Sequence, residues 1–234
     1  MRGLDGLYLA VLSQAINSND SLIMSRFKLV MGRIVAAREP LSVSAHAKLY
    51  GEDDATGFLR IILRPLGSLL SGCTQELVPL RPLHTSFFDF LKEESRSHSY
   101  YVDPSQHNRG LTLLSLRTMK SGLKFNICNL RTSHLRNDHI PGLATRVDET
   151  IRPHLAYACR FWADHLSATV YDPEVLGELW DFMHNQLLSW LEVLSLVKQV
   201  KIASRMLSSI LQWSQASLAV HYSTAARIPD IYTA

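Results

Sequence analysis

Cysteines and long apolar runs are both scarce in this sequence. Its three cysteines, Cys73, Cys128 and Cys159, are odd in number and lie far apart. This usage predicts reduced thiols in a cytoplasmic protein and no disulfide framework. No apolar run approaches the roughly 20 residues that a membrane span needs, so we expect no transmembrane helix. Asp5 interrupts the apolar N-terminus, whose leucines follow a helical period, and this favours an amphipathic helix over a signal peptide.

The common signatures of catalysis are also missing. The sequence has no G-x-x-x-x-G-K-[ST] phosphate loop, no G-x-S-x-G, no H-E-x-x-H and no C-x-x-C. Among its ten histidines, His134 and His139 form the closest pair. On a helix they would point to different faces, and no third ligand completes a metal set. We therefore predict no metal site, no catalytic residues and no enzyme.

The composition is that of a folded globular protein. Hydrophobic residues make up 47% of the chain and charged residues 19%, which excludes a disordered chain. With 234 residues, the chain is long enough for one or two domains with a sizeable core. The formal net charge of +3 is too small to indicate a nucleic-acid partner by itself.

The first 95 residues predict helices followed by a β-hairpin. Residues 1–21 form a linker helix, and residues 22–95 form a domain of three short helices and the hairpin. The first two helices of this domain meet at the tight turn "REPLS", because Pro40 cannot continue a helix. The two β-capable runs, "SLLSGC" and "ELVPLRPLH", have a turn near Gly72 between them. Three helices and a hairpin, in this order, are typical of a winged-helix domain.

Residues 96–234 predict an all-α helical bundle or array. Asp103 and Pro104 begin one helix, and Asp172 and Pro173 begin another that continues through "LLSWLEVLSLV". The segment "RTSHLRNDHIPGLATRVDET" is a polar connector, and a last helix covers about 198–214. The fold class is therefore mainly α, a winged-helix domain followed by a helical bundle.

Several polar and aromatic residues of this second region have a plain structural interpretation. His165 and His184 each lie close to an aspartate in the sequence, yet we expect them on helix surfaces rather than in an acid–base pair. The four tryptophans are spaced as core residues rather than as a platform for stacking bases: Trp162, Trp180, Trp190 and Trp213.

The segment "RPLHTSFFDFL" places His84 between the second β-run and a short aromatic helix. It resembles the histidine motif in the winged-helix domain of STAND-class signalling NTPases, and in particular the "PLHxSFxDFL" segment of fungal NACHT proteins. The flanking blocks are similar to the same fungal family. They are "LDGLYLAVLSQAI", "FKLVMGRIVAAREPLSVSAHAKLYG", "YYVDPSQHNRGLTLLSLRTMKSGLKFNICNL" and "ACRFWADHLSA". The resemblance covers nearly the whole chain.

The resemblance implies a regulatory role for His84. In the family this histidine reaches from the winged helix to the phosphates of ADP on the nucleotide-binding domain and holds the protein closed. Complete members also have a P-loop, a Mg²⁺ motif and often WD-type repeats, and this sequence has none of them. We therefore expect the non-catalytic segment that follows the NTPase core, without ADP, ATP or Mg²⁺ of its own. Such a segment could be a truncated gene product, a degenerate paralogue or an excised fragment, and the sequence does not distinguish these origins. Its expected partners are a nucleotide-binding domain and a WD-type repeat domain.

Two alternatives stay open. His84 could instead cap the following helix or pack beside Phe87 and Phe90. The winged helix could also bind DNA, with Lys48 and Arg60 near the groove, but the acidic run 52–54 would repel phosphate.

Overall fold

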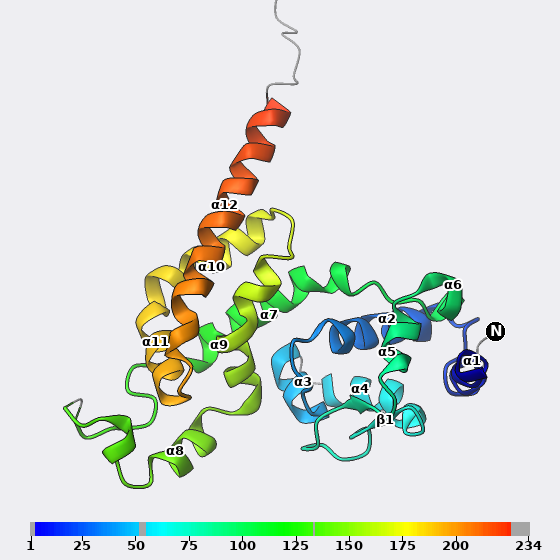
Figure 1. Cartoon of the computed structure of the whole chain (residues 1–234), viewed down its shortest axis with the longest axis horizontal. Helices are drawn as coiled ribbons and strands as arrows, with labels where there is room; N and C mark the ends of the chain where they lie inside the picture. The colour runs from blue at the N-terminus through cyan, green and yellow to red at the C-terminus, as the bar shows by residue number, and fades with distance from the viewer. Residues whose placement is uncertain (1–2, 52–54, 133, 226–234) are drawn as a thin grey trace, which may run out of the picture.

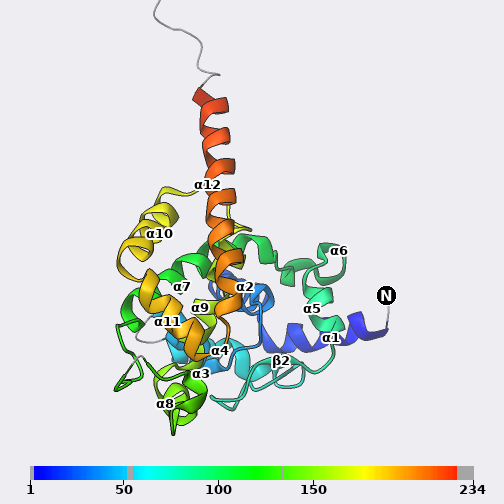
Figure 2. The same ribbon diagram turned by 60° about the vertical axis from the view of Figure 1, so that its left-hand side comes forward.

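The computed structural model describes the backbone of residues 3–51, 55–132 and 134–225 (Figure 1). In these ranges the chain is mainly α, as predicted, with twelve α-helices and one two-stranded sheet. Figure 1 shows α1–α6 on one side and α10–α12 on the other, and in both Figures 1 and 2 the last part of α12 extends away from the other helices. No helix in the described ranges is long and apolar enough to cross a membrane.

The N-terminal half contains six helices and the sheet. Their bounds are α1 (Gly3–Ala15), α2 (Ser21–Ala36), α3 (Val43–Tyr50), α4 (Ala55–Leu63), β1 (Leu70–Ser71), β2 (Arg81–Pro82), α5 (Ser86–Leu91) and α6 (Glu94–Ser97). Side-chain caps explain two of the boundaries. Asp20 accepts hydrogen bonds from the N–H groups of Leu22 and Ile23 at the start of α2, and Ser42 caps α3, which ends at Gly51 with a φ of 69°.

The hairpin is joined to the segment between α2 and α3. β1 and β2 are antiparallel, and Ser42, between α2 and α3, makes an isolated bridge to Pro79. Gly72 makes the turn possible, because its φ is 81° and a Cβ there would lie 2.8 Å from the carbonyl oxygen of Val78. The order along the chain is therefore helix, bridge, helix, helix and hairpin. Val78, which the sequence suggested as part of the second strand, lies outside it.

Helix α1 packs on the helices that follow the hairpin. The ring of Tyr8 lies 5.3 Å from the ring of Phe87 and 5.2 Å from that of Phe90. About one turn before Tyr8, Asp5 accepts two hydrogen bonds from the guanidinium of Arg96, at 2.6 and 3.1 Å. The segment expected as a linker thus shares its core with α5 and α6.

The described residues of the C-terminal half form helices and loops, and no strand. Its helices are α7 (Asn108–Gly122), α8 (Leu143–Thr150), α9 (Pro153–Leu166), α10 (Pro173–Asn185), α11 (Leu187–Leu196) and α12 (Ala203–Ala225). Trp162 on α9 packs against both Phe182 and Trp190, with ring centroids 5.0 and 6.0 Å away. Three of the four tryptophans are buried, as predicted: Trp162, Trp190 and Trp213. The prediction that Trp180 is a core residue is wrong, because it is 66% exposed.

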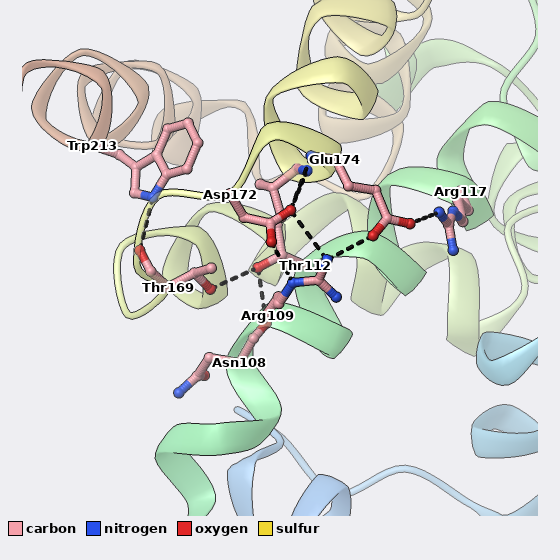
Figure 3. A network of polar contacts seen from close by, with 9 residues as sticks. Asn108, Arg109, Thr112, Arg117, Thr169, Asp172, Glu174 and Trp213 are labelled. Atoms are coloured by element: carbon pink, nitrogen blue, oxygen red, sulfur yellow. Dashed lines mark hydrogen bonds and ion pairs between the residues drawn. The ribbon is translucent and has the colours of Figure 1, made fainter. Parts of the chain in front are cut away.

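Charged side chains join α7 to α10 along their exposed edge (Figure 3). Arg109 donates to Asp172 at 2.8 and 3.1 Å and to Glu174 at 2.6 Å. Arg117 in turn contacts Glu174 and Glu178. Asp172 also caps α10 through the N–H groups of residues 174 and 175. One carboxylate therefore both begins a helix and fixes it to its neighbour.

Three boundaries differ from the sequence prediction. The segment read as a polar connector contains α8. The helix that begins at Pro173 breaks at Gln186, where φ is −120°, so α10 and α11 are separate. The last helix spans 203–225 rather than about 198–214. In each case the hydrophobic period alone does not mark where a helix starts or turns.

Candidate functional site

His84 lies at the corner between β2 and α5. The N–H of Leu83 donates to the carbonyl oxygen of Leu69 at 2.9 Å, which ties the residue before His84 to the hairpin. The carbonyl oxygen of His84 accepts from the N–H of Phe87 at 3.0 Å, which ties His84 itself to the first turn of α5. The backbone is thus held on both sides, while the side chain is exposed.

The hydrogen bonds of the His84 ring fix its tautomer. The backbone N–H of Ser86 donates to Nδ1 at 3.2 Å, and the hydroxyl of Ser86 lies 2.7 Å from the same atom. Because Nδ1 accepts, the proton of the neutral ring is on Nε2. The hydroxyl of Tyr8 is 2.8 Å from that of Ser86. Tyr8 on α1 therefore contacts the Ser86 hydroxyl, and Ser86 contacts Nδ1 of His84. The Nε2–H group of His84 remains available as a donor.

The geometry is compatible with both roles considered for His84, which are capping α5 and binding a phosphate. Its Nδ1 takes up an N–H at the start of α5, which is a capping contact. The rings of Phe87 and Phe90 are fully buried, whereas the imidazole is exposed. In the described part of the chain we find no hydrogen bond to Nε2. A donor in this position can bind an anion through a charge-assisted hydrogen bond, and the exposed Arg81 is three residues away.

A second polar cluster joins the two halves of the chain. The backbone N–H of Arg38, in the turn between α2 and α3, donates to the hydroxyl of Tyr157 on α9 at 3.1 Å. That hydroxyl is 2.8 Å from Nε2 of His165, and Nδ1 of His165 is 2.9 Å from the Asn108 side-chain oxygen. Beside this chain, Arg160 binds Glu39. The cluster connects the turn between α2 and α3 with α9 and the start of α7.

The prediction that His165 lies on a helix surface is wrong. Its side chain is 0% exposed, and burial lowers its pKa to about 3, with Arg38 acting in the same direction. The sequence held a signal for this. His165 follows the buried Trp162 by three positions and the buried Ala158 by seven, so it belongs to the apolar face of α9. His184 is exposed, as predicted.

The other candidate groups are not brought together. The described residues contain no group of three or more histidine, cysteine, aspartate or glutamate side chains that could hold a metal ion. The three cysteines are free and buried, and burial raises the pKa of the Cys73 thiol to about 11. On the face considered for DNA, Arg60 pairs with Glu76. The acidic run 52–54 lies outside the described residues.

We find no match to this chain among protein-family models, curated proteins or solved structures.

Proposed function

We propose that this chain is a non-catalytic regulatory segment of a NACHT-type signalling protein. In this proposal residues 22–95 form a winged-helix domain that presents His84 to a diphosphate on a separate nucleotide-binding domain. The order of helix, bridge, helix, helix and hairpin supports the winged helix. The observation that carries the proposal is the exposed imidazole, whose Nδ1 is occupied and whose Nε2–H points to no partner within the described residues.

The proposed action is a bias between two arrangements of domains. Nε2–H of His84 donates to a β-phosphate oxygen of ADP, and such a contact forms only when the two domains are closed together. A contact made in one arrangement alone shifts the equilibrium toward that arrangement by its own free energy. His84 is then a positioning element of a switch and takes no part in hydrolysis.

The buried cluster around Tyr157 and His165 supports a regulatory role for the helices. It joins the turn at Arg38 to α9 and to Asn108, so a displacement of the first domain pulls on the helical array. We propose that the helices pass this displacement to the WD-type repeats of a complete protein. The binding of DNA is less well supported, because Arg60 is paired with Glu76 and Ile61 exposes an apolar side chain beside it.

The proposal is tested in two steps. The isolated chain is first titrated with a fluorescent ADP analogue, and we expect no tight binding because the phosphate loop is missing. The chain then replaces the matching segment of a complete NACHT-type protein, and the release of bound ADP is followed. His84→Ala should speed release, whereas the exposed control His139→Ala should not. Tight binding by the isolated chain, or equal release from both variants, would contradict the proposal.

A further inference from the structure

Three histidines of the C-terminal half lie where it packs on the N-terminal half. His107 is the last residue of a 3₁₀ helix (Pro104–His107) that packs along α2, and a Cβ on Gly32 of α2 would lie 1.9 Å from its Nε2. His154 is in the first turn of α9, which packs on α3. His165, at the other end of α9, reaches the turn between α2 and α3 through the cluster described above. We call the contact of α2, α3 and their turn with residues 104–107 and α9 the joint.

Each of these histidines faces a cation of the N-terminal half across the joint. The pairs are Arg33 with His107, Lys48 with His154 and Arg38 with His165. At each histidine burial is the largest cause of a lowered pKa, and the cation is the second. Arg33 also lowers the pKa of His46, but both belong to the N-terminal half, so this pair does not lie across the joint.

Two further charges lie beside the first two rings. Asp103, which precedes the 3₁₀ helix, raises the pKa of His107, but by less than burial and the facing arginine lower it. Arg152, which precedes α9, lowers the pKa of His154 in the same direction as the facing lysine. A proton on either ring is therefore disfavoured in the closed joint.

The carboxylates near His165 already have partners. Glu39 binds Arg160 across the joint, and Asp164 binds Arg205 on α12. A proton added to Nε2 of His165 would also face the hydroxyl proton that this atom now accepts. The closed joint thus holds this ring in its neutral form as well.

We propose that the joint is a pH-sensitive switch, in which protonation of His107, His154 and His165 loosens the docking of the two halves. Opening the joint exposes the rings to water, where each can bind a proton, whereas in the closed joint that proton is buried beside a cation of the other half. Acidification below about pH 6.5 therefore favours the open arrangement, and neutral pH favours the closed one. The inference goes beyond the proposed function and does not depend on His84, so either can fail without the other.

The backbone N–H of Arg38 reports the opening directly, because it donates across the joint to the Tyr157 hydroxyl at 3.1 Å. Its hydrogen exchange is followed by NMR on the full chain from pH 7 to pH 5, and each rate is corrected for unprotected exchange at the same pH. The amides of Val30 in α2 and Val193 in α11, both fully buried, are the references for the two cores. We expect Arg38 to exchange faster than both. Its protection should fall by up to about tenfold per pH unit for each titrating histidine.

Two variants and one control assign this pH dependence to the joint. In the double variant His107→Gln and His154→Gln, two half-buried rings are replaced by side chains that bind no proton, so the protection of the Arg38 amide should fall less steeply with acid. Lys48→Glu changes an exposed side chain and should also reduce the slope, because a carboxylate favours the charged form of His154. His139→Gln is the matched control, because this exposed histidine lies outside the joint, and it should leave the slope unchanged.

Three results would overturn the inference. In the first, the Arg38 amide exchanges as slowly as the two reference amides, so the halves separate only when the whole chain unfolds. In the second, its protection is the same at pH 7 and pH 5. In the third, Lys48→Glu and His139→Gln have the same pH profile. Circular dichroism checks the fold of every variant, and Lys48→Glu keeps the test decisive if the double variant does not fold.

Discussion

The Tyr157 hydroxyl lies 2.8 Å from Nε2 of His165 inside the protein, and the two residues are eight positions apart on α9. The side-chain oxygen of Asn108 can only accept, so the proton of the neutral imidazole is on Nδ1, which donates to it. Nε2 therefore accepts from the Tyr157 hydroxyl, whose oxygen accepts from the N–H of Arg38. The hydrogen bonds run in one direction from the turn after α2 to the start of α7. All of these hydrogen bonds form only when the two halves of the molecule pack against each other.

Replacing Tyr157 by phenylalanine should destabilise the protein without changing its fold. The substitution removes one hydroxyl and leaves both Nε2 of His165 and the N–H of Arg38 without that partner. Leaving a buried polar group unpaired costs about 1–3 kcal/mol. Urea unfolding followed by circular dichroism measures the change. Tyr101→Phe is the control, because this tyrosine lies near the surface, and it should change stability by much less. Equal stability of both variants would contradict the role given to Tyr157.

Acidification should destabilise the protein between about pH 6.5 and pH 5. Burial, with a nearby arginine, lowers the pKa of His165 to about 3 and that of His46 to about 4, from 6.5. Above pH 6.5 these side chains are neutral in both the folded and the unfolded chain, so they contribute nothing. Below it only the unfolded chain takes up the protons, and the free energy of unfolding falls by about 1.4 kcal/mol per pH unit for each histidine.

Unfolding curves at pH 7, 6 and 5 measure this slope. Burial also lowers the pKa of His107 and of His154, which act with the same sign. His46→Leu provides the control, because Nδ1 of His46 has no hydrogen-bond partner within the described residues. The variant should be about as stable at pH 7, and its slope should be smaller by about 1.4 kcal/mol per pH unit. A slope unchanged by this substitution would show that His46 is not a source of the pH dependence.

The sequence predicted the elements best where local chemistry decides them. Asp172 and Pro173 begin α10, as predicted, through a side-chain cap and a proline in the first turn, and Gly72 makes the hairpin turn. Helix α8 was missed because it is short and mostly polar: only Leu143 is buried, and Val147 is partly buried beside the core. The break between α10 and α11 was missed for the opposite reason. Apolar residues at helical spacing lie on both sides of the polar residues 184–186, so the hydrophobic period runs across the break.

The polar cluster around His165 shows what a single sequence does not reveal. Its members, Arg38, Asn108, Tyr157 and His165, come from distant segments, and their pairing depends on how the two halves dock. The residue type alone does not show whether a histidine is buried. For His165 the only signal in the sequence is its position on the apolar face of α9. The corner at His84 was easier to predict because the hairpin and the helix that form it are adjacent along the chain.

Gly32→Ala should destabilise the contact between α2 and the segment before α7. A Cβ at Gly32 would lie 1.9 Å from Nε2 of His107, so the imidazole would have to move out of its site. Overpacking of this kind costs about 1–3 kcal/mol. The midpoint of thermal unfolding and a urea titration measure the loss. In the His107→Ala background the same substitution should cost much less, because the clashing ring is gone.

Gly177→Ala is the matched control, since no atom lies within 4 Å of a Cβ at this helical position. Alanine should raise stability there by about 0.5–1 kcal/mol through its higher helix propensity. If Gly32→Ala were as stable as Gly177→Ala, or if its cost were the same with and without His107, the packing of His107 on Gly32 would be refuted.

His84→Ala should leave the isolated chain folded. The substitution removes Nδ1, the acceptor for the N–H of Ser86, but this N–H is exposed and can bind water, so the cost should be at most about 1 kcal/mol. Nitrogen NMR of the histidine rings should show His84 of the unchanged chain as the tautomer with its proton on Nε2. In Ser86→Ala the ring loses the hydroxyl contact, and Tyr8 loses its hydrogen bond to α5 but keeps its packing on Phe87 and Phe90. A chain that unfolds when His84 is replaced would make His84 a structural residue, because its loss would then exceed that of one exposed capping contact.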